Sequence, residues 1–519
     1  MAWPPGHLLL VHDPASVQGS QGKGRFLTGV LTRLGPANYN PGTGLLGDFL
    51  AVSPASCAAP ASLQQIAIFT AEALSRREKP LHLPTSASLR LGGEVSSKLL
   101  LRFAPRMRFY RGMKNLTRFA LLFTALFAAC FWLADARGAE NSGSPSNYLV
   151  YIGTNTAQKS QGIYVFKFAA AAGKLTPLGL AAKSDNPGFL AIHPNHRYLY
   201  AVNEIGEYQG EKSGSVSAFS LDHKTGKLTL LNIVASGGSG PTHLVVDKTG
   251  KYVLVANYGA GSVALLPILA DGRLGAATTV LPQTGHSVDP GRQQEPHAHS
   301  VYVSPDNRFA VSADLGTDQV YVYRFDASKG TLVPGNPPSI AVPAGSGPRH
   351  FAFDPHGRFG YVIEEMGSSI TTFAYNAMLG VLNPLQTIST LPSDYKGSST
   401  CAEVEMHPSG KFLYGSNRGH DSITVFAIDP VKGTLTPIEY VPTGGKTPRN
   451  FGIDPTGNYL IAANQDSDSL TVFRIDPKTG RLTPKGQKEE APTPICVIFE
   501  PVEESVNVHI GASVEWVIQ

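Results

Sequence analysis

The feature that most constrains the fold of this chain is a sevenfold internal repeat, which begins at Tyr148 and ends near Pro501. One repeated segment opens on proline or a small residue and closes on a short polar turn. Its seven copies are PGFLAIHP from Pro187, PTHLVVDK from Pro241, AHSVYVSP from Ala298, PRHFAFDP from Pro348, CAEVEMHP from Cys401, PRNFGIDP from Pro448 and PICVIFEP from Pro494. A second segment opens on an aromatic residue, and its seven copies start at Tyr148, Tyr198, Tyr252, Phe309, Phe359, Phe412 and Tyr459.

Two further segment types recur seven times each. One has an apolar residue followed by an aromatic residue, from GIYVFKF to DSLTVFRID, and the other is a Gly-x-Leu turn and strand, from GKLTP to GRLTP. Four short strands in a repeat of roughly 50 residues are typical of β-propeller blades. The sequence therefore predicts an all-β fold, a seven-bladed β-propeller over residues 145–501.

The order of the segments also predicts how the ring closes. The aromatic segment at Tyr148 has no proline-type segment before it, and the proline-type segment at Pro494 has no aromatic segment after it. We expect the N- and C-terminal strands to share one blade, because such closure removes the exposed sheet edges of an open array.

Composition agrees with this fold and excludes several classes of protein. The chain has 54 glycines, 39 prolines and 16% charged residues, which suits many short strands joined by turns. The net charge of +4 comes without a basic run, so we expect no nucleic-acid partner. The four cysteines have no CxxC spacing, which argues against a disulfide scaffold or a zinc site.

The chain before the repeats divides into two parts. Residues 1–106 have no strand or helix period, and we interpret them as a disordered or mis-called upstream extension. Residues 107–136 combine basic residues after Met107 and Met113 with the apolar run FALLFTALFAACFWLA and an Ala-Asp-Ala exit, which is typical of a signal peptide. We expect a periplasmic or secreted protein with no stable membrane insertion after cleavage. An internal signal anchor and a cytoplasmic protein are the alternatives, and the tail 502–519 lies outside the repeats.

Candidate functional residues lie where the repeats differ from one another. Asparagine recurs after the second strand at Asn203, Asn257, Asn417 and Asn464, which favours a structural role in turns. The starts of the first strands and the ends of the second strands are expected to meet at one mouth of the central channel, a common ligand site. The variable polar residues there are His243, His299, Arg349, His350, Glu403, Arg449 and Asn450 on first strands, and Asp314, Glu365 and Arg418 after second strands.

Two alternatives accompany this ring of residues. His243, His299 and His350 fall in equivalent positions, which favours a function, whereas the arginines could instead form salt bridges that join blades. Histidines and carboxylates also suit a divalent metal. We expect no metal, because several guanidinium groups at the same mouth would repel a cation.

Three segments carry a resemblance to a known family: GSGPRHFAFDPHGRFGYVIEEMGSSI, EVEMHPSGKFLYGSNRGHDSITVF and TPRNFGIDPTGNYLIAANQDSDSLTVF. The segments HAHSV and ADLGTDQV agree with it as well. The chain resembles the bacterial seven-bladed lactonase family, which includes propeller-type 6-phosphogluconolactonase and, more distantly, the fungal 3-carboxymuconate cyclase. One departure is Glu364-Glu365, where the family usually has Asn-Glu. Two adjacent carboxylates are expected to raise one pKa or to change the charge offered to the substrate.

The resemblance implies a lactone hydrolase that needs no cofactor and acts on a small-molecule lactone with an anionic group, most of all 6-phosphogluconolactone or a related sugar lactone. It implies His299, Arg349, Glu365 and Arg418 as catalytic residues, with His350, Glu403 and Asn450 nearby. Glu365 or His299 would accept a proton from water, and the arginines would hold the anionic group. A muconate-type lactonizing cyclase and a non-catalytic secreted propeller that binds a ligand or protein are the alternatives. The sequence does not predict the oligomeric state.

Overall fold

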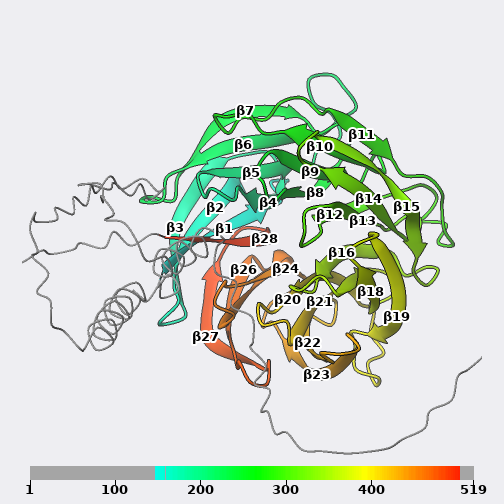
Figure 1. Ribbon diagram of the computed structural model, residues 1–519. Coiled ribbons are helices and arrows are strands. Elements are labelled where there is room, and N and C mark those ends of the chain that lie inside the picture. The colour runs from blue at the N-terminus through cyan, green and yellow to red at the C-terminus, as the bar shows by residue number, and fades with distance from the viewer. Residues whose placement is uncertain (1–146, 158, 503–519) are drawn as a thin grey trace, which may run out of the picture. The chain divides into compact units, whose positions relative to one another are not determined.

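The computed structural model describes residues 147–157 and 159–502, which form seven four-stranded antiparallel sheets arranged around a centre (Figure 1). The predicted upstream extension and signal peptide lie outside the described residues, as does nearly all of the tail. The all-β prediction is confirmed: within the described residues, helical structure is confined to the short 3-10 turn η1 (Gln465–Ser467). That part of the chain accordingly has no helix with the length and apolar character needed to cross a membrane.

Each sheet is one blade, and its four strands follow one another from the channel outward. Blade 1 contains β28 (Pro494–Pro501), β1 (Asn147–Thr154), β2 (Gly162–Ala169) and β3 (Lys174–Lys183); blade 2 contains β4 (Pro187–Ile192), β5 (Tyr198–Asn203), β6 (Ser215–Leu221) and β7 (Leu228–Ala235). Blade 3 contains β8 (Pro241–Val246), β9 (Tyr252–Asn257), β10 (Ser262–Pro267) and β11 (Thr279–Pro282); blade 4 contains β12 (Ala298–Val303), β13 (Phe309–Asp314), β14 (Gln319–Asp326) and β15 (Thr331–Ala341). Blade 5 contains β16 (Pro348–Phe353), β17 (Phe359–Glu364), β18 (Ser369–Asn376) and β19 (Val381–Ser389); blade 6 contains β20 (Thr400–Met406), β21 (Phe412–Arg418), β22 (Ser422–Ile428) and β23 (Leu435–Pro442). Blade 7 contains β24 (Pro448–Ile453), β25 (Tyr459–Asn464), β26 (Ser469–Ile475) and β27 (Leu482–Glu490).

The ring closes as predicted, because the two ends of the propeller share blade 1. β28 pairs antiparallel with β1, with Tyr148 opposite Pro501 and Tyr151 opposite Ile498. The innermost strand of every blade contacts the innermost strand of the next blade, and β28 contacts both β24 and β4. The seven innermost strands therefore form a continuous ring around the channel, in which each strand pairs only within its own blade.

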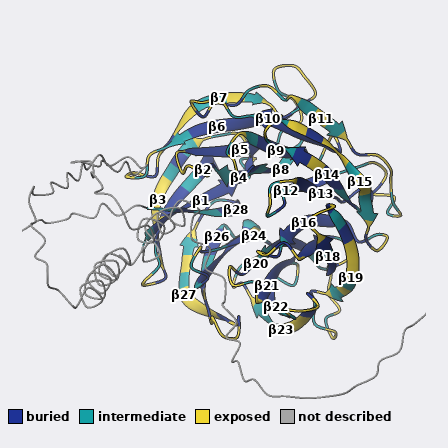
Figure 2. Ribbon diagram, viewed as in Figure 1, coloured by how far each residue is buried: buried dark blue, intermediate teal, exposed yellow. Residues whose placement is uncertain are grey.

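The hydrophobic core lies between the blades. Among the described residues there are seven apolar clusters, and each cluster joins two adjacent blades. The inner strands are mostly buried and the outermost strands alternate between exposed and half-buried residues (Figure 2). Burial of apolar surface at these interfaces supplies most of the driving force for folding.

The Gly-x-Leu turn of each repeat has a packing role at these interfaces. Gly480 has a φ of +72°, and a Cβ there would lie 2.5 Å from the Phe412 ring of the preceding blade. The hydroxyl of Tyr414 on the same strand donates a hydrogen bond to the Gly480 carbonyl at 2.8 Å, and Tyr200 bonds Gly272 in the same way. The turn needs glycine both for the left-handed backbone and for this close approach.

Candidate active site

A β-bulge near the start of every innermost strand shapes the channel mouth. Each inner strand skips a pairing position directly after its first residues. Bulges of this kind turn a side chain away from the regular ladder and are common beside active sites. Six of the bulged residues line a small cavity at the mouth: Gly188, Thr242, His299, Arg349, Arg449 and Ile495.

The bulges correct one expectation about the histidines. His299 lies in the bulge of β12, the position that Arg349 occupies in β16. His243 and His350 lie one residue further along their strands, paired with Ala256 and Ile363. The three histidines are therefore not equivalent, because His299 is itself the bulged residue of its strand whereas His243 and His350 follow the bulge of theirs.

The mouth cavity is small and polar. Phe189, Glu204 and His350 complete its lining, and the space open to the centre of a water molecule is about 10 Å³. Arg349 is buried, whereas Arg449 is half-buried and has neither a hydrogen bond nor an ion pair with any described residue. The mouth therefore offers one guanidinium that is free to bind an anion.

Glu365 organises the arginines around this cavity. Its carboxylate accepts hydrogen bonds from Arg292 at 2.9 Å and from Arg349 at 3.1 Å. Arg418 lies 2.9 Å from the same carboxylate. Burial would raise the pKa of Glu365, but the three guanidinium groups outweigh it and hold the pKa at about 2. A carboxylate with so low a pKa and three cationic partners is a poor proton acceptor.

Arg349 remains a cation in this environment. Burial, together with Arg418 and Arg449, lowers its pKa to about 10, which keeps the guanidinium charged at neutral pH. Its Nη1 also donates to the carbonyl of Ala402 at 2.7 Å. These two contacts fix the side chain at the edge of the cavity.

His299 faces the cavity as a neutral imidazole. Burial lowers its pKa well below the ordinary value, and the surrounding arginines, Arg349 first, lower it further. Its Nε2 lies 3.9 Å from the Glu365 carboxylate, and its Nδ1 is buried without a hydrogen-bond partner among the described residues. The ring can accept or donate one hydrogen bond but resists taking up a proton.

The channel below the mouth is filled by a second layer of predicted residues. His350 hydrogen-bonds Glu403 at 2.9 Å, and Asn450 donates to the same carboxyl group. His243 packs between Phe189 and His350, with ring centroids 4.1 and 5.3 Å away. Burial raises the pKa of Glu403 to about 8, so the carboxyl is largely protonated at neutral pH. His243, Glu403 and Asn450 therefore lie behind the residues that line the cavity and are not part of its lining.

Asp314 lies apart from the cavity. Its Oδ1 accepts hydrogen bonds from the backbone amides of His297, Gly316 and Thr317 at 2.9 to 3.0 Å. Burial raises its pKa to about 6 against the effect of these amides. The carboxyl holds the loop ends beside β12 and β13 in place.

Glu364 occupies the position that asparagine holds in four other blades. Its carboxylate accepts hydrogen bonds from the hydroxyl groups of Ser369 and Thr371. Asn417 contacts the equivalent hydroxyl groups, Ser422 and Thr424, but its Nδ2 is the donor. Burial raises its pKa, with Asp318 as a further acidic neighbour. The Glu364-Glu365 pair thus separates into a residue that braces one blade and a residue that faces the arginines.

Two charged residues of the mouth, Glu204 and Arg292, were not among the predicted site residues. Glu204 follows β5 as Glu365 follows β17, so its place in the repeat was a signal for it. Arg292 comes from the loop between β11 and β12 and bonds Tyr258 as well as Glu365, at 3.1 and 2.9 Å. Because this loop, residues 283–297, is longer than the corresponding loops of the other blades, the repeat pattern held no signal for Arg292.

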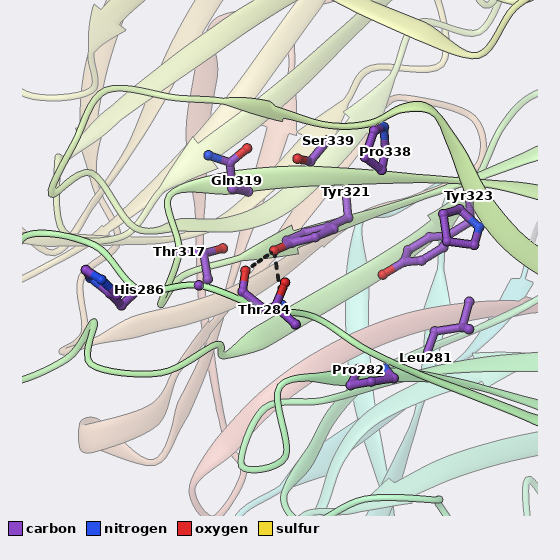
Figure 3. A pocket seen from close by; sticks show the side chains of 12 residues that line it. Leu281, Pro282, Thr284, His286, Thr317, Gln319, Tyr321, Tyr323, Pro338 and Ser339 are labelled. Carbon is purple, nitrogen blue, oxygen red and sulfur yellow. Dashed lines mark hydrogen bonds between the residues drawn. The ribbon is translucent and has the colours of Figure 1, made fainter. Parts of the chain in front are cut away.

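A larger cavity lies between the outer strands of blades 3 and 4 (Figure 3). Its volume is about 470 Å³, and its lining includes Tyr321, Tyr323, Pro338 and His286. None of its lining residues is Asp, Glu, Lys or Arg. The Tyr321 hydroxyl is already engaged with Thr284 (Figure 3). This cavity has the room for a ligand but offers no lysine or arginine side chain to hold an anionic substrate.

Other chemistries find little support in the part of the chain that is described. No group of three or more His, Cys, Asp or Glu residues there is arranged to hold a metal ion. Cys401 and Cys496 are buried, and burial raises the pKa of the Cys401 thiol to about 12. A thiol with this pKa is protonated at neutral pH and is a weak nucleophile.

The described residues form a seven-bladed propeller with arginines at the mouth of its channel, and the comparisons with known proteins identify its family. The family model "Lactonase, 7-bladed beta-propeller" matches residues 149–499. The chain therefore belongs to the seven-bladed β-propeller lactonase family, which places it among the lactone hydrolases and confirms the predicted family.

Individual relatives agree with this assignment. A 6-phosphogluconolactonase of Bacillus subtilis is 35% identical over 309 residues, covering 60% of this chain and 86% of the relative. A 6-phosphogluconolactonase of Formosa agariphila is 35% identical over 311 residues, covering 59% and 86%. The structure of the periplasmic gluconolactonase of Pseudomonas aeruginosa matches with a TM-score of 0.65 and 35% identity, covering 69% of this chain and 100% of that chain.

Proposed function

We propose that the protein hydrolyses the ring ester of a sugar lactone that carries an anionic group, with 6-phosphogluconolactone or a closely related aldonolactone as the substrate. The observation that carries this proposal is the mouth cavity, where Arg349 is fixed by Glu365 and Arg449 has no protein partner among the described residues. The names of the 6-phosphogluconolactonase and gluconolactonase relatives support the same substrate class.

The arginines would supply the electrostatic part of catalysis. When water adds to the lactone carbonyl, the carbonyl oxygen gains a negative charge. A guanidinium fixed in a site that excludes water stabilises that charge without reorganising. Arg349 is held for this role by Glu365, and Arg418 braces the same carboxylate from the next blade. Arg449 would bind the anionic substituent, and neutral His299 would hydrogen-bond the ring ester.

Binding requires the mouth to widen, because space of about 10 Å³ holds no more than a single water molecule. Of the three arginine side chains on Glu365, that of Arg292 is 44% exposed, against 3% for Arg349 and 14% for Arg418. We propose that Arg292 swings away from Glu365 when a lactone enters and that the other two arginines stay in place.

A pH-stat assay of wild-type protein and Arg449→Ala with phosphorylated and unphosphorylated gluconolactone tests the proposed function. We expect hydrolysis well above the spontaneous rate. In Arg449→Ala, KM for the phosphorylated lactone should rise by about 10- to 100-fold, the effect of losing a charged hydrogen bond. KM for the unphosphorylated lactone should change less. A wild-type trace equal to the spontaneous rate for every lactone would favour a binding protein instead.

We also propose that the protein is exported, with residues 107–136 as its signal peptide. The likeness to the periplasmic gluconolactonase of Pseudomonas aeruginosa supports this localisation. N-terminal sequencing of protein from its native source should find a first residue near Arg137. A cytoplasmic protein that retains residues 1–106 would contradict it.

A further inference from the structure

The mouth contains a carboxylate with no assigned partner, Glu204. It follows β5 in blade 2 and lines the same cavity as Arg349, Arg449 and His299. Its carboxylate makes no hydrogen bond or ion pair with any described residue, in contrast to Glu365 with its three guanidinium partners. A Cβ on Gly188 would lie only 3.1 Å from the Glu204 Oε2, so the absence of a side chain at Gly188 leaves room for this carboxylate.

The other proton acceptors near the cavity are poorly suited to activate water. The Glu365 carboxylate already pairs with three arginine side chains. The Glu403 carboxyl lies below the cavity and is hydrogen-bonded to His350 and Asn450. His299 is surrounded by guanidinium groups that disfavour its protonated form. Among the described residues that line the cavity, Glu204 is the one that carries a carboxylate. Burial raises its pKa against the opposing effect of Arg449 and Arg349. A raised pKa makes a carboxylate a better base at neutral pH.

We propose that Glu204 is the general base of the lactonase reaction, an assignment that rests on the proposed function. Glu204 takes one proton from water while the water oxygen bonds to the lactone carbonyl carbon. The carbonyl π electrons move onto the oxygen beside Arg349. When the intermediate collapses, the bond between the carbonyl carbon and the ring oxygen breaks, and the proton on Glu204 passes to that ring oxygen. The product is the open hydroxy acid, and Glu204 returns to its starting state.

The first test compares Glu204→Gln with Glu207→Gln, an exposed residue close by in the same loop. General bases contribute about 10²- to 10⁴-fold to turnover, so kcat of Glu204→Gln should fall within that range while KM and the unfolding temperature stay near the wild-type values. The fall in kcat toward low pH should disappear in Glu204→Gln. Glu207→Gln should match the wild type. In Glu204→Ala, added formate should restore part of kcat, which a purely structural role would not allow.

The second test uses the contact between Gly188 and Glu204. Gly188→Ala should lower kcat by displacing the carboxylate, but it should have no further effect in the Glu204→Gln background. An equal loss in both backgrounds would mean that the added methyl group blocks the substrate, and would overturn the assignment. An active wild type with an equally active Glu204→Gln would also overturn it and leave the proposed function standing. A wild type with no lactonase activity would overturn both.

Discussion

The interfaces between blades and the mouth of the channel follow opposite rules. At the interfaces the same contact recurs: in four of the seven blades a tyrosine hydroxyl, at Tyr151, Tyr200, Tyr361 or Tyr414, donates a hydrogen bond to the carbonyl of a turn glycine in the next blade. At the mouth the bulged position carries a different residue in nearly every blade, including Thr242, His299 and Arg349. Repetition thus marks the contacts that stabilise the fold, and variation marks the residues available for chemistry.

Arg349→Ala should disrupt the mouth and leave the interfaces intact, and among the variants that compare these two regions it should lower turnover most. Removing one group that stabilises an oxyanion typically lowers kcat by about 10²- to 10³-fold. Steady-state kinetics measure the loss. Arg273→Ala is the control, because Arg273 forms an exposed ion pair with Asp271 and should change neither kcat nor stability appreciably. Equal activity of the two variants would remove Arg349 from the reaction.

Glu365 makes the stability of the mouth depend on pH. Its folded-state pKa of about 2 lies below the ordinary 4.5, so its stabilisation is complete above pH 4.5 and is lost as the pH falls toward 2. A depression of this size corresponds to about 3 kcal/mol. Urea unfolding should therefore find Glu365→Gln less stable than the wild type at pH 7, with the difference shrinking below pH 4.5. A difference that stays constant with pH would contradict the assigned role.

Two glycines allow the interface to be tested with a matched pair. Gly480 and Gly444 have φ of +72° and +71°, but only Gly480 faces an aromatic ring of another blade, and a Cβ at Gly444 would meet nothing within 4 Å. Both alanine variants should lose about 1 to 2 kcal/mol to the left-handed backbone. Gly480→Ala should lose about 1 to 3 kcal/mol more through overpacking, and both should keep kcat at 25 °C. Equal unfolding free energies would mean that the turn does not pack as described.

Tyr200→Phe should have the smallest effect. It removes the buried hydrogen bond to Gly272 and should lower the unfolding free energy by about 1 kcal/mol with no change in kcat. Tyr440→Phe is the control, because the Tyr440 hydroxyl makes no hydrogen bond with a described residue. Calorimetry measures both variants. A lower kcat in Tyr200→Phe would couple the interfaces to the mouth and weaken the distinction between the two regions.

The sequence predicted the fold more completely than the site, for reasons that particular residues make clear. The seven repeats and the unpaired segments at Tyr148 and Pro494 were enough for the blades and their closure, because β pairing follows from local pattern and order. The site depends on features that do not follow the sevenfold repeat. His299 is the bulged residue of its strand whereas His243 and His350 are not, Asp314 accepts hydrogen bonds from backbone amides, and Arg292 lies on a connecting loop that is longer than those of the other blades.

The sequence also did not predict which residues each charged side chain of the site would contact. Glu364 and Glu365 are adjacent and have the same side chain, but their partners differ. Glu364 accepts hydrogen bonds from two hydroxyl groups within its blade, and Glu365 pairs with three arginines. Alternation along a strand sends neighbouring side chains to different surroundings. Which of those surroundings is charged depends on contacts between blades, and these form only in the folded ring.

The position of a bound product tests the central claim most directly, because the structure offers two cavities. Crystals of the protein with the stable hydrolysis product 6-phosphogluconate should place its anionic groups within hydrogen-bond distance of Arg349 and Arg449, with Arg292 moved away from Glu365. Product bound instead between blades 3 and 4, against Tyr321 and Pro338, with the mouth still closed, would contradict the account.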